Sequence, residues 1–194
     1  MKLEIILFPV SIILLSVAIL FDVNFLHYAS PVPHDQWQKI NFYDFRGFKK
    51  PGLTLDGMSE FAYIKTSRTV RCLPTGEVEI ITFFHPSRSY VFAQDIRNPD
   101  LLRHELYHFH IAEYFSRLFR RELCAEASSI NAAMIDRLKR KYNDLEFEMQ
   151  AQYDHDSYHS YVMQEQRNWE LKVDSLLHSL EEFSRPIVSI KVKP

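Results

Sequence analysis

Uncharged and mostly apolar residues fill the start of the chain from Ile5 to Phe21, after a positive charge at Lys2. A run of about 17 such residues lies at the short end of a membrane-spanning helix and at the long end of a signal-peptide core. A buried core helix is the alternative, but it would show a polar stripe that this run lacks. We therefore predict export, with residues 1–28 as a signal peptide or a transmembrane anchor, and the pattern leaves cleavage open.

Short stretches rich in aromatic and β-branched residues follow, and turn residues such as Pro74-Thr75-Gly76 separate them. This pattern is typical of strands. Residues 29–39, which include two prolines in SPVPHD, are predicted to be a linker before them. The predicted strands are Ile40–Phe45, Phe61–Ser67, Thr69–Leu73, Val78–His85 and Arg88–Ala93.

Apolar positions in the second half recur at three- and four-residue spacing, which predicts helices. The first helix runs from Leu101 to about Cys124, and the second, more polar one covers residues 127–150. Residues 153–157 (YDHDS) are expected to interrupt it, so that a last helix begins near Asp156 or Ser157.

This order of elements, with strands first and helices second, indicates an α+β fold. We expect an N-terminal, mainly antiparallel β-sheet followed by three helices, in one domain over residues 40–194.

Composition and charge exclude several classes of function. The chain has 194 residues, of which 46% are hydrophobic and 25% charged, which is typical of a globular domain. Its 23 basic and 25 acidic residues give a net charge of −2, so nucleic acid is not an expected partner. Only 4 glycines occur, and no phosphate-binding glycine motif is present.

The two cysteines, Cys72 and Cys124, allow two interpretations in an exported domain. They could form one disulfide, or they could be two buried free thiols. Their spacing does not resemble a cysteine-based zinc site.

The most informative motif is His104-Glu105-Leu106-Tyr107-His108, an HExxH pattern inside the first predicted helix. Positions four apart on a helix lie on the same face, so His104 and His108 can bind one Zn²⁺ ion. Glu105 can then take a proton from a water on the metal as it attacks a carbonyl, and pass it to the leaving amine. The alternative is that both histidines are solvated or serve as core residues.

A catalytic zinc needs a third protein ligand and one open position. His110 and Glu113 are expected to point away from the face that carries His108. His159 is the preferred third ligand, because a turn before the last helix could return it to the metal. Asp154 and Asp156 are the fallback ligands.

The segment LLRHELYHFHIAEYFSRLFRREL resembles the core motif, approximately HExxHFDIAExxAR, of a family of uncharacterised bacterial proteins described as secreted zinc-dependent proteases. His110 stands where the family has Asp, and Ser116 where it has Ala. The matching residues are His104, Glu105, His108, Phe109, Ile111, Ala112, Glu113 and Arg117.

A second pattern of that family, approximately YDxxTxHG followed by QxxW, is similar to the segment from Tyr153 to Trp169. Ser157 replaces its Thr, and Ser160 replaces its Gly. The segments NFYDFRGF and RSYVFA also resemble family elements, so the likeness covers roughly residues 40–180.

The resemblance implies a zincin-like fold with His104 and His108 as zinc ligands and Glu105 as base, and it supports His159 as the third ligand. Tyr153 or Tyr158 could donate a hydrogen bond to the oxyanion, although packing is the alternative for both. Gln166 and Trp169 are expected to lock the last helix against the HExxH helix.

We therefore expect an exported or membrane-anchored zinc metallopeptidase of the cell envelope, the periplasm or the exterior, with one Zn²⁺ per chain. Its expected partners are a peptide or protein substrate and, if the N-terminal segment is retained, the membrane. The alternative is a non-catalytic envelope protein whose zinc site is structural or binds a partner, with Asp154 or His155 closing the fourth position. The basic residues near Arg117, Arg120 and Arg137 are expected on solvated helix faces, because acids lie between them.

Overall fold

The computed structural model describes residues 13, 15–17, 28–48, 61–126 and 130–189. Almost all of the predicted signal or anchor segment, residues 1–28, lies outside this part of the chain. Among the described residues, none of the helices has the length and apolar character that a membrane crossing requires.

An antiparallel sheet is built around β4 (Glu77–Phe84). β3 (Thr66–Cys72) pairs with one edge of β4. On the other edge, β1 (Val32–Pro33) pairs with the end of β4 near Phe84, and β6 (Ile187–Ser189) pairs with its beginning near Glu77. A second, two-stranded antiparallel sheet joins β2 (Ala62–Tyr63) to β5 (Tyr90–Val91). Alternate residues of β4 are buried, as expected for a strand with one face on the core: Val78, Ile80, Thr82 and Phe84.

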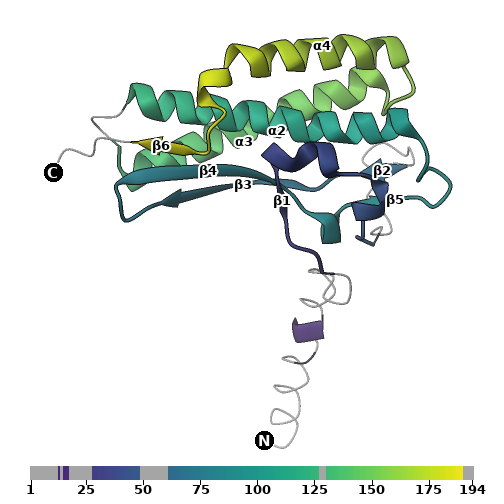
Figure 1. Cartoon of the computed structure of the whole chain (residues 1–194), viewed down its shortest axis with the longest axis horizontal. Helices are drawn as coiled ribbons and strands as arrows, with labels where there is room; N and C mark the ends of the chain where they lie inside the picture. The colour runs from purple at the N-terminus through teal and green to yellow at the C-terminus, as the bar shows by residue number, and fades with distance from the viewer. Residues whose placement is uncertain (1–12, 14, 18–27, 49–60, 127–129, 190–194) are drawn as a thin grey trace, which may run out of the picture.

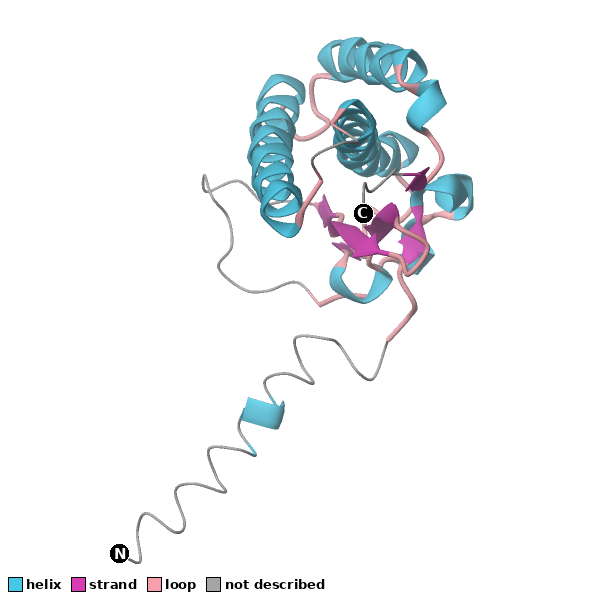
Figure 2. Ribbon diagram, turned by 90° about the vertical axis from the view of Figure 1, so that its left-hand side faces the viewer, coloured by secondary structure: helices cyan, strands magenta, loops and turns pink. Residues whose placement is uncertain are grey.

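Three long helices cover one face of the larger sheet: α2 (Pro99–Ala125), α3 (Ala132–Ser157) and α4 (Met163–Ser179) (Figures 1 and 2). α2 packs against the sheet on one side and against α3 and α4 on the other. The Asn98 side chain caps α2 by accepting hydrogen bonds from the amides of Asp100 and Leu101, both 3.1 Å long. This arrangement confirms the α+β class with antiparallel strands and three long helices, whereas β6, which follows α4 and returns to the sheet, was not predicted.

Two apolar clusters hold α2 in this central position. The larger one joins the α2 residues Ile111, Phe115 and Phe119 to the inner face of the sheet and to α3 and α4. The smaller one joins Leu101 and Phe109 of α2 to residues 40–45 and to the strand region that includes Ala62 and Phe84. Gln166 of α4 donates to the Asp100 carbonyl at 3.1 Å and so helps to join α4 to α2 as expected. Trp169 is 7% exposed, and it contacts Tyr153 and Asp156 of α3.

Two predictions for the N-terminal part of the domain are wrong. Residues 29–39 are not a linker, because β1 pairs with β4 and the 3₁₀ helix η2 (His34–Lys39) packs on α2. The predicted strand Ile40–Phe45 is instead a 3₁₀ helix, η3 (Phe42–Asp44). There the side chains of Asn41 and Asp44 each accept a hydrogen bond from a backbone amide. This reciprocal cap stabilises the 3₁₀ helix over the strand that the alternating pattern predicts.

The helical half also differs from prediction at one boundary. α3 continues without a break through residues 153–157, since this stretch contains neither glycine nor proline to end it. It ends at Ser157, the following residue, Tyr158, adopts the left-handed conformation, and α4 begins at Met163 rather than near residue 156. His159 therefore lies in the turn between the two helices and not in α4.

Two further expectations about single residues fail. Cys72 and Cys124 are free and exposed, so they form neither a disulfide nor a pair of buried thiols. Arg117 and Arg120 are 9% and 2% exposed rather than solvated. Arg120 donates to the Ile80 carbonyl at 2.7 Å and to Glu113 at 2.8 Å. These hydrogen bonds and the charge of Glu113 offset the desolvation cost of the buried guanidinium.

Candidate metal centre

The HExxH segment lies in the N-terminal part of α2 and presents its two histidines on one face of that helix. His104 is 1% exposed, and its ring packs at 88° against the ring of His108. The two Nε2 atoms are 3.2 Å apart. The spacing of four residues therefore brings the two imidazoles together as the sequence predicts.

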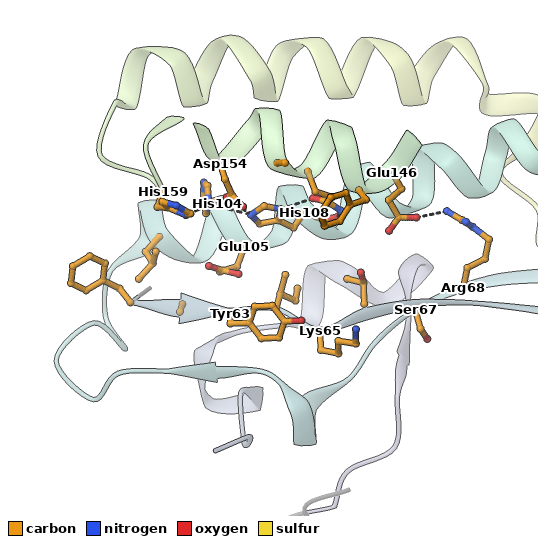
Figure 3. A pocket seen from close by; sticks show the side chains of 18 of the residues that line it. Tyr63, Lys65, Ser67, Arg68, His104, Glu105, His108, Glu146, Asp154 and His159 are labelled. Carbon is orange, nitrogen blue, oxygen red and sulfur yellow. Dashed lines mark hydrogen bonds and ion pairs between the residues drawn. The ribbon is translucent and has the colours of Figure 1, made fainter. Parts of the chain in front are cut away.

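Asp154, in the last turns of α3, adds a carboxylate to this pair. Its Oδ1 atom lies 3.1 Å from His104 Nε2 and 2.9 Å from His108 Nε2 (Figure 3). Because α3 is uninterrupted, Asp154 comes from a helix face rather than from the predicted turn.

His159 approaches the same point from the turn after α3. Its Nδ1 atom lies 3.5 Å from Asp154 Oδ1, and the ligand atoms of His104, Asp154 and His159 all lie within 4.8 Å of one another. Three consecutive residues of this turn, Tyr158, His159 and Ser160, have φ angles of 49°, 51° and 74°. Such left-handed backbone is costly outside glycine and is concentrated at functional sites.

Three of these donor atoms, from His104, Asp154 and His159, lie close enough together to share one metal ion, and His108 Nε2 lies beside two of them without belonging to that group. Ligand atoms around a tetrahedral zinc lie about 3.3 Å apart, because Zn–N bonds are about 2.0–2.1 Å long. Four of the six separations among these atoms are given above, and these four, from 2.9 to 3.5 Å, scatter around that value. Imidazole nitrogen and carboxylate oxygen are also the ligand types that zinc prefers.

The electrostatics of the cluster also favour a shared cation. Burial lowers the pKa of His104 to about 4, although the hydrogen bond with Asp154 opposes this. Burial, the largest single cause, also acts against charge on His108, but Asp154, Glu105 and the hydrogen bond with Gln150 together outweigh it and raise the pKa of His108 to about 9. The same imidazoles, above all His108, hold the pKa of Asp154 below its usual range against the effect of burial. The cluster is thus a half-buried carboxylate that attracts positive charge.

Gln150 fixes the orientation of His108 and was not found from the sequence. Its Nε2 donates to the His108 carbonyl at 2.9 Å, and its Oε1 contacts His108 Nδ1. Because an amide oxygen only accepts, Nδ1 carries the proton in this bond. This places the proton of a neutral His108 on Nδ1 and leaves the Nε2 lone pair free for a metal.

A cleft of about 660 Å³ opens beside the cluster. Glu105 is 4% exposed and lines it, and Figure 3 shows its carboxylate directed from α2 toward the wall that carries Tyr63. The α3 residues on the opposite wall share one helix face: Asn143, Glu146, Phe147, Gln150, Ala151 and Asp154. Their three- and four-residue spacing is the one sequence signal that could have revealed Gln150.

Tyr153 lies behind the cluster and not in the cleft. It is 0% exposed, its ring stacks on His104 with a centroid distance of 4.6 Å, and it does not line the cleft. Its hydroxyl donates to the His104 carbonyl at 3.5 Å, and burial raises its pKa above the ordinary value. This position favours packing over donation to an oxyanion.

The other residues considered from the sequence lie apart from the cluster. His110 faces η2, where its Nδ1 is 2.8 Å from His34 Nε2, as expected for a residue pointing away from the metal. His155 has a side chain that is 83% exposed, so it cannot close the site. Asp156 accepts a hydrogen bond from Trp169 at 3.0 Å instead. Tyr158 is 50% exposed and also lies outside the lining of the cleft.

Comparison of the chain with protein-family models, with curated proteins and with solved structures gives no match. The geometry described above therefore carries the functional argument alone.

Proposed function

We propose that this protein is a zinc-dependent metallopeptidase of the cell envelope, with His104, His108 and His159 as ligands and Glu105 as general base and acid. One observation carries the proposal. The donor atoms of His104, Asp154 and His159 lie within 4.8 Å of one another, with His108 Nε2 at 2.9 Å from Asp154 Oδ1, beside a cleft that a second carboxylate, Glu105, also lines.

The zinc ion, when bound, lowers the pKa of a coordinated water to about 7 and polarises a carbonyl group. Glu105 lies at the cleft, next in sequence to His104, and accepts the proton that is lost as the carbonyl is attacked. It then donates that proton to the departing amine. Gln150 keeps His108 oriented throughout, because the nitrogen and the oxygen of its side-chain amide are both hydrogen-bonded to this residue.

A peptide substrate is supported by the wall opposite α3. Residues 61–68 line the cleft as a continuous stretch that contains β2 and the start of β3. β3 pairs only with β4 among the described strands, which leaves its other edge without a strand partner. An extended peptide can add to such an edge through backbone hydrogen bonds.

The proposal is tested by the variant Glu105→Gln. The carboxamide keeps the shape of the side chain but cannot accept the proton, so we expect peptide hydrolysis to fall by about 10²–10⁴-fold. Bound zinc, measured by elemental analysis, should stay at one per chain. Glu148→Gln, an exposed position on the same protein, is the matched control and should retain activity. Full activity of Glu105→Gln would remove the proposed mechanism.

A second candidate is a closed zinc site without catalysis, and the position of Asp154 favours it. Its Oδ1 is within 3.5 Å of all three imidazoles, as a fourth ligand would be. Structural zinc sites have four protein ligands, whereas catalytic sites keep a position open. A protein that loses zinc on Asp154→Ala and that hydrolyses no peptide in its wild-type form would support this candidate instead.

A further inference from the structure

One end of the cleft is closed by a bridge between β3 and α3. Arg68 of β3 reaches α3, where it donates to Glu146 at 2.5 Å and to Asn143 at 2.9 Å. It also donates to Ser116 of α2 at 2.9 Å, so its guanidinium is tied to both helices. An extended substrate that enters past the metal centre therefore meets a wall at this end (Figure 3).

Arg68 and Lys65 are the arginine and lysine side chains that line the cleft, and they differ in whether an acidic side chain neutralises their charge. The side chain of Arg68 is 4% exposed and is neutralised by Glu146. Lys65, by contrast, has no ion-pair partner within the described part of the chain, and only its backbone is hydrogen-bonded: its amide donates to Ser89 Oγ at 2.8 Å, and its carbonyl accepts from the His85 amide at 2.8 Å. In Figure 3 its ammonium end turns toward the cleft, on the side of the metal centre where Glu146 lies.

We propose that Lys65 forms a subsite for a carboxylate of the substrate, between the metal centre and the closed end of the cleft. This inference rests on the proposed peptidase function and names its substrate class: a peptide with a negative charge close to the bond that is cleaved. Two sources offer that group, the free C-terminus of a peptide and the side chain of Asp or Glu.

The surroundings of Lys65 make this recognition specific. Glu146 repels a substrate carboxylate, but Arg68 cancels its charge, so the uncompensated positive charge of the closed end lies on Lys65. Phe147, which is 71% exposed, lines the α3 wall of the same cleft and offers an apolar surface to a substrate. A half-buried ammonium discriminates more strongly between charged and neutral ligands than a fully solvated one.

The test measures binding and not turnover, so that it does not depend on hydrolysis. The full chain with Glu105→Gln is loaded with zinc, and fluorescence anisotropy records the binding of labelled peptides of one sequence. The peptides are a free acid, its C-terminal amide, and two amidated forms that carry Glu or Gln near the end. We expect a carboxylate form to bind about tenfold more tightly than its neutral counterpart.

Variants then assign the effect to Lys65. Lys65→Met should abolish the preference, Lys65→Arg should retain it, and the exposed Lys39→Met is the matched control. A preference for the free acid alone identifies the chain terminus, whereas a preference for Glu over Gln identifies an acidic side chain. Equal binding of all four peptides by the Glu105→Gln chain with Lys65 intact overturns the proposal, even if Lys65→Met does not fold. So does a preference that persists in Lys65→Met.

The outcomes for the subsite and for the peptidase are separable. If the zinc-loaded chain prefers carboxylates but the wild-type protein never hydrolyses a peptide, the proposed function fails and the subsite stands. If the wild-type protein hydrolyses neutral and acidic peptides alike, the function stands and the subsite fails.

Discussion

Helix α2 carries two buried clusters of polar side chains, and they differ in how their donors and acceptors are matched. On the sheet side, Glu113 accepts from Thr82 at 2.6 Å and from Arg120 at 2.8 Å, and Arg120 also donates to the Ile80 carbonyl. On the cleft side, the nitrogens of His104 and His108 both face Asp154 Oδ1, and His104 Nδ1 is buried without a hydrogen-bond partner among the described residues.

The comparison separates a cluster that supports the fold from one that is suited to a ligand. In the sheet-side cluster, charges of both signs are balanced and each group has a protein partner, which is what burial requires. In the cleft-side cluster, three imidazoles converge on one carboxylate oxygen, and a cation would satisfy this arrangement better than protons do. Burial of polar residues alone therefore does not indicate a ligand-binding site. Several imidazole nitrogens that converge on one carboxylate oxygen do indicate a site for a cation.

The largest expected effect tests the sheet-side cluster. Glu113→Ala leaves the Arg120 guanidinium buried without its carboxylate, and we expect the free energy of unfolding to fall by about 3–5 kcal/mol. Urea denaturation measures this loss, and zinc content of the folded fraction should remain unchanged. Glu148→Ala, at an exposed position, is the control and should change stability by less than about 0.5 kcal/mol. A small loss for Glu113→Ala would contradict the structural role of the cluster.

The second prediction uses a pair of histidines that satisfy each other without an ion, His34 and His110. Burial, the largest cause, lowers the pKa of His34 from 6.5 to about 4, so the folded protein binds fewer protons than the unfolded chain in this range. Stability is therefore complete above about pH 6.5 and decreases by up to about 3 kcal/mol as the pH falls to about 4.

Unfolding measured across this pH range, without metal, should show a shallower decrease for His34→Gln than for the wild type. His110 contributes a decrease in both proteins, because burial is the largest cause that lowers its pKa, to about 3 in the wild type, and burial does not depend on the charge of His34. Identical pH profiles for the two proteins would show that the pair is not a neutral, mutually bonded unit.

A smaller effect concerns the orientation of the metal ligands. Gln150→Leu removes both hydrogen bonds to His108, and we expect zinc affinity to fall by about 10–100-fold, as for other residues that orient a ligand. Competition with a chromophoric chelator measures the affinity. Gln164→Leu, on the exposed face of α4, should have no such effect. Unchanged affinity in Gln150→Leu would mean that His108 is not a ligand or does not need this support.

The smallest expected effect concerns the turn that positions His159. Ser160 has a φ of 74°, where a side chain is strained and glycine is not. Ser160→Gly should raise the free energy of unfolding by about 0.5–1 kcal/mol in urea denaturation, with zinc content unchanged. A loss of stability would show that the Ser160 side chain has a stabilising contact in the turn.

The sequence predicts the parts of this molecule that depend on local periodicity. The alternation of Val78, Ile80 and Phe84 identifies β4, and the helical spacing around His104 and His108 identifies α2 and places both imidazoles on one face. Each of these features needs only the geometry of a single element.

Features that depend on distant partners were not predictable in this way. Gln150 lies 42 residues from His108, and only the packing of α3 on α2 brings them together. The burial of Arg120 depends on a carbonyl of β4 that is 40 residues away. The loss of the predicted strand at Ile40–Phe45 has a local cause, since the cap formed by Asn41 and Asp44 opposes the alternating pattern.

The central claim, that the cleft-side cluster binds one metal ion, is tested most directly by the zinc content of the purified protein. Elemental analysis of the wild type should give one zinc per chain. His104→Ala should lose it, while His155→Ala, which removes an exposed histidine next to Asp154, should keep it. A folded wild-type protein that takes up no zinc, or equal zinc content in the wild type and His104→Ala, would contradict the account.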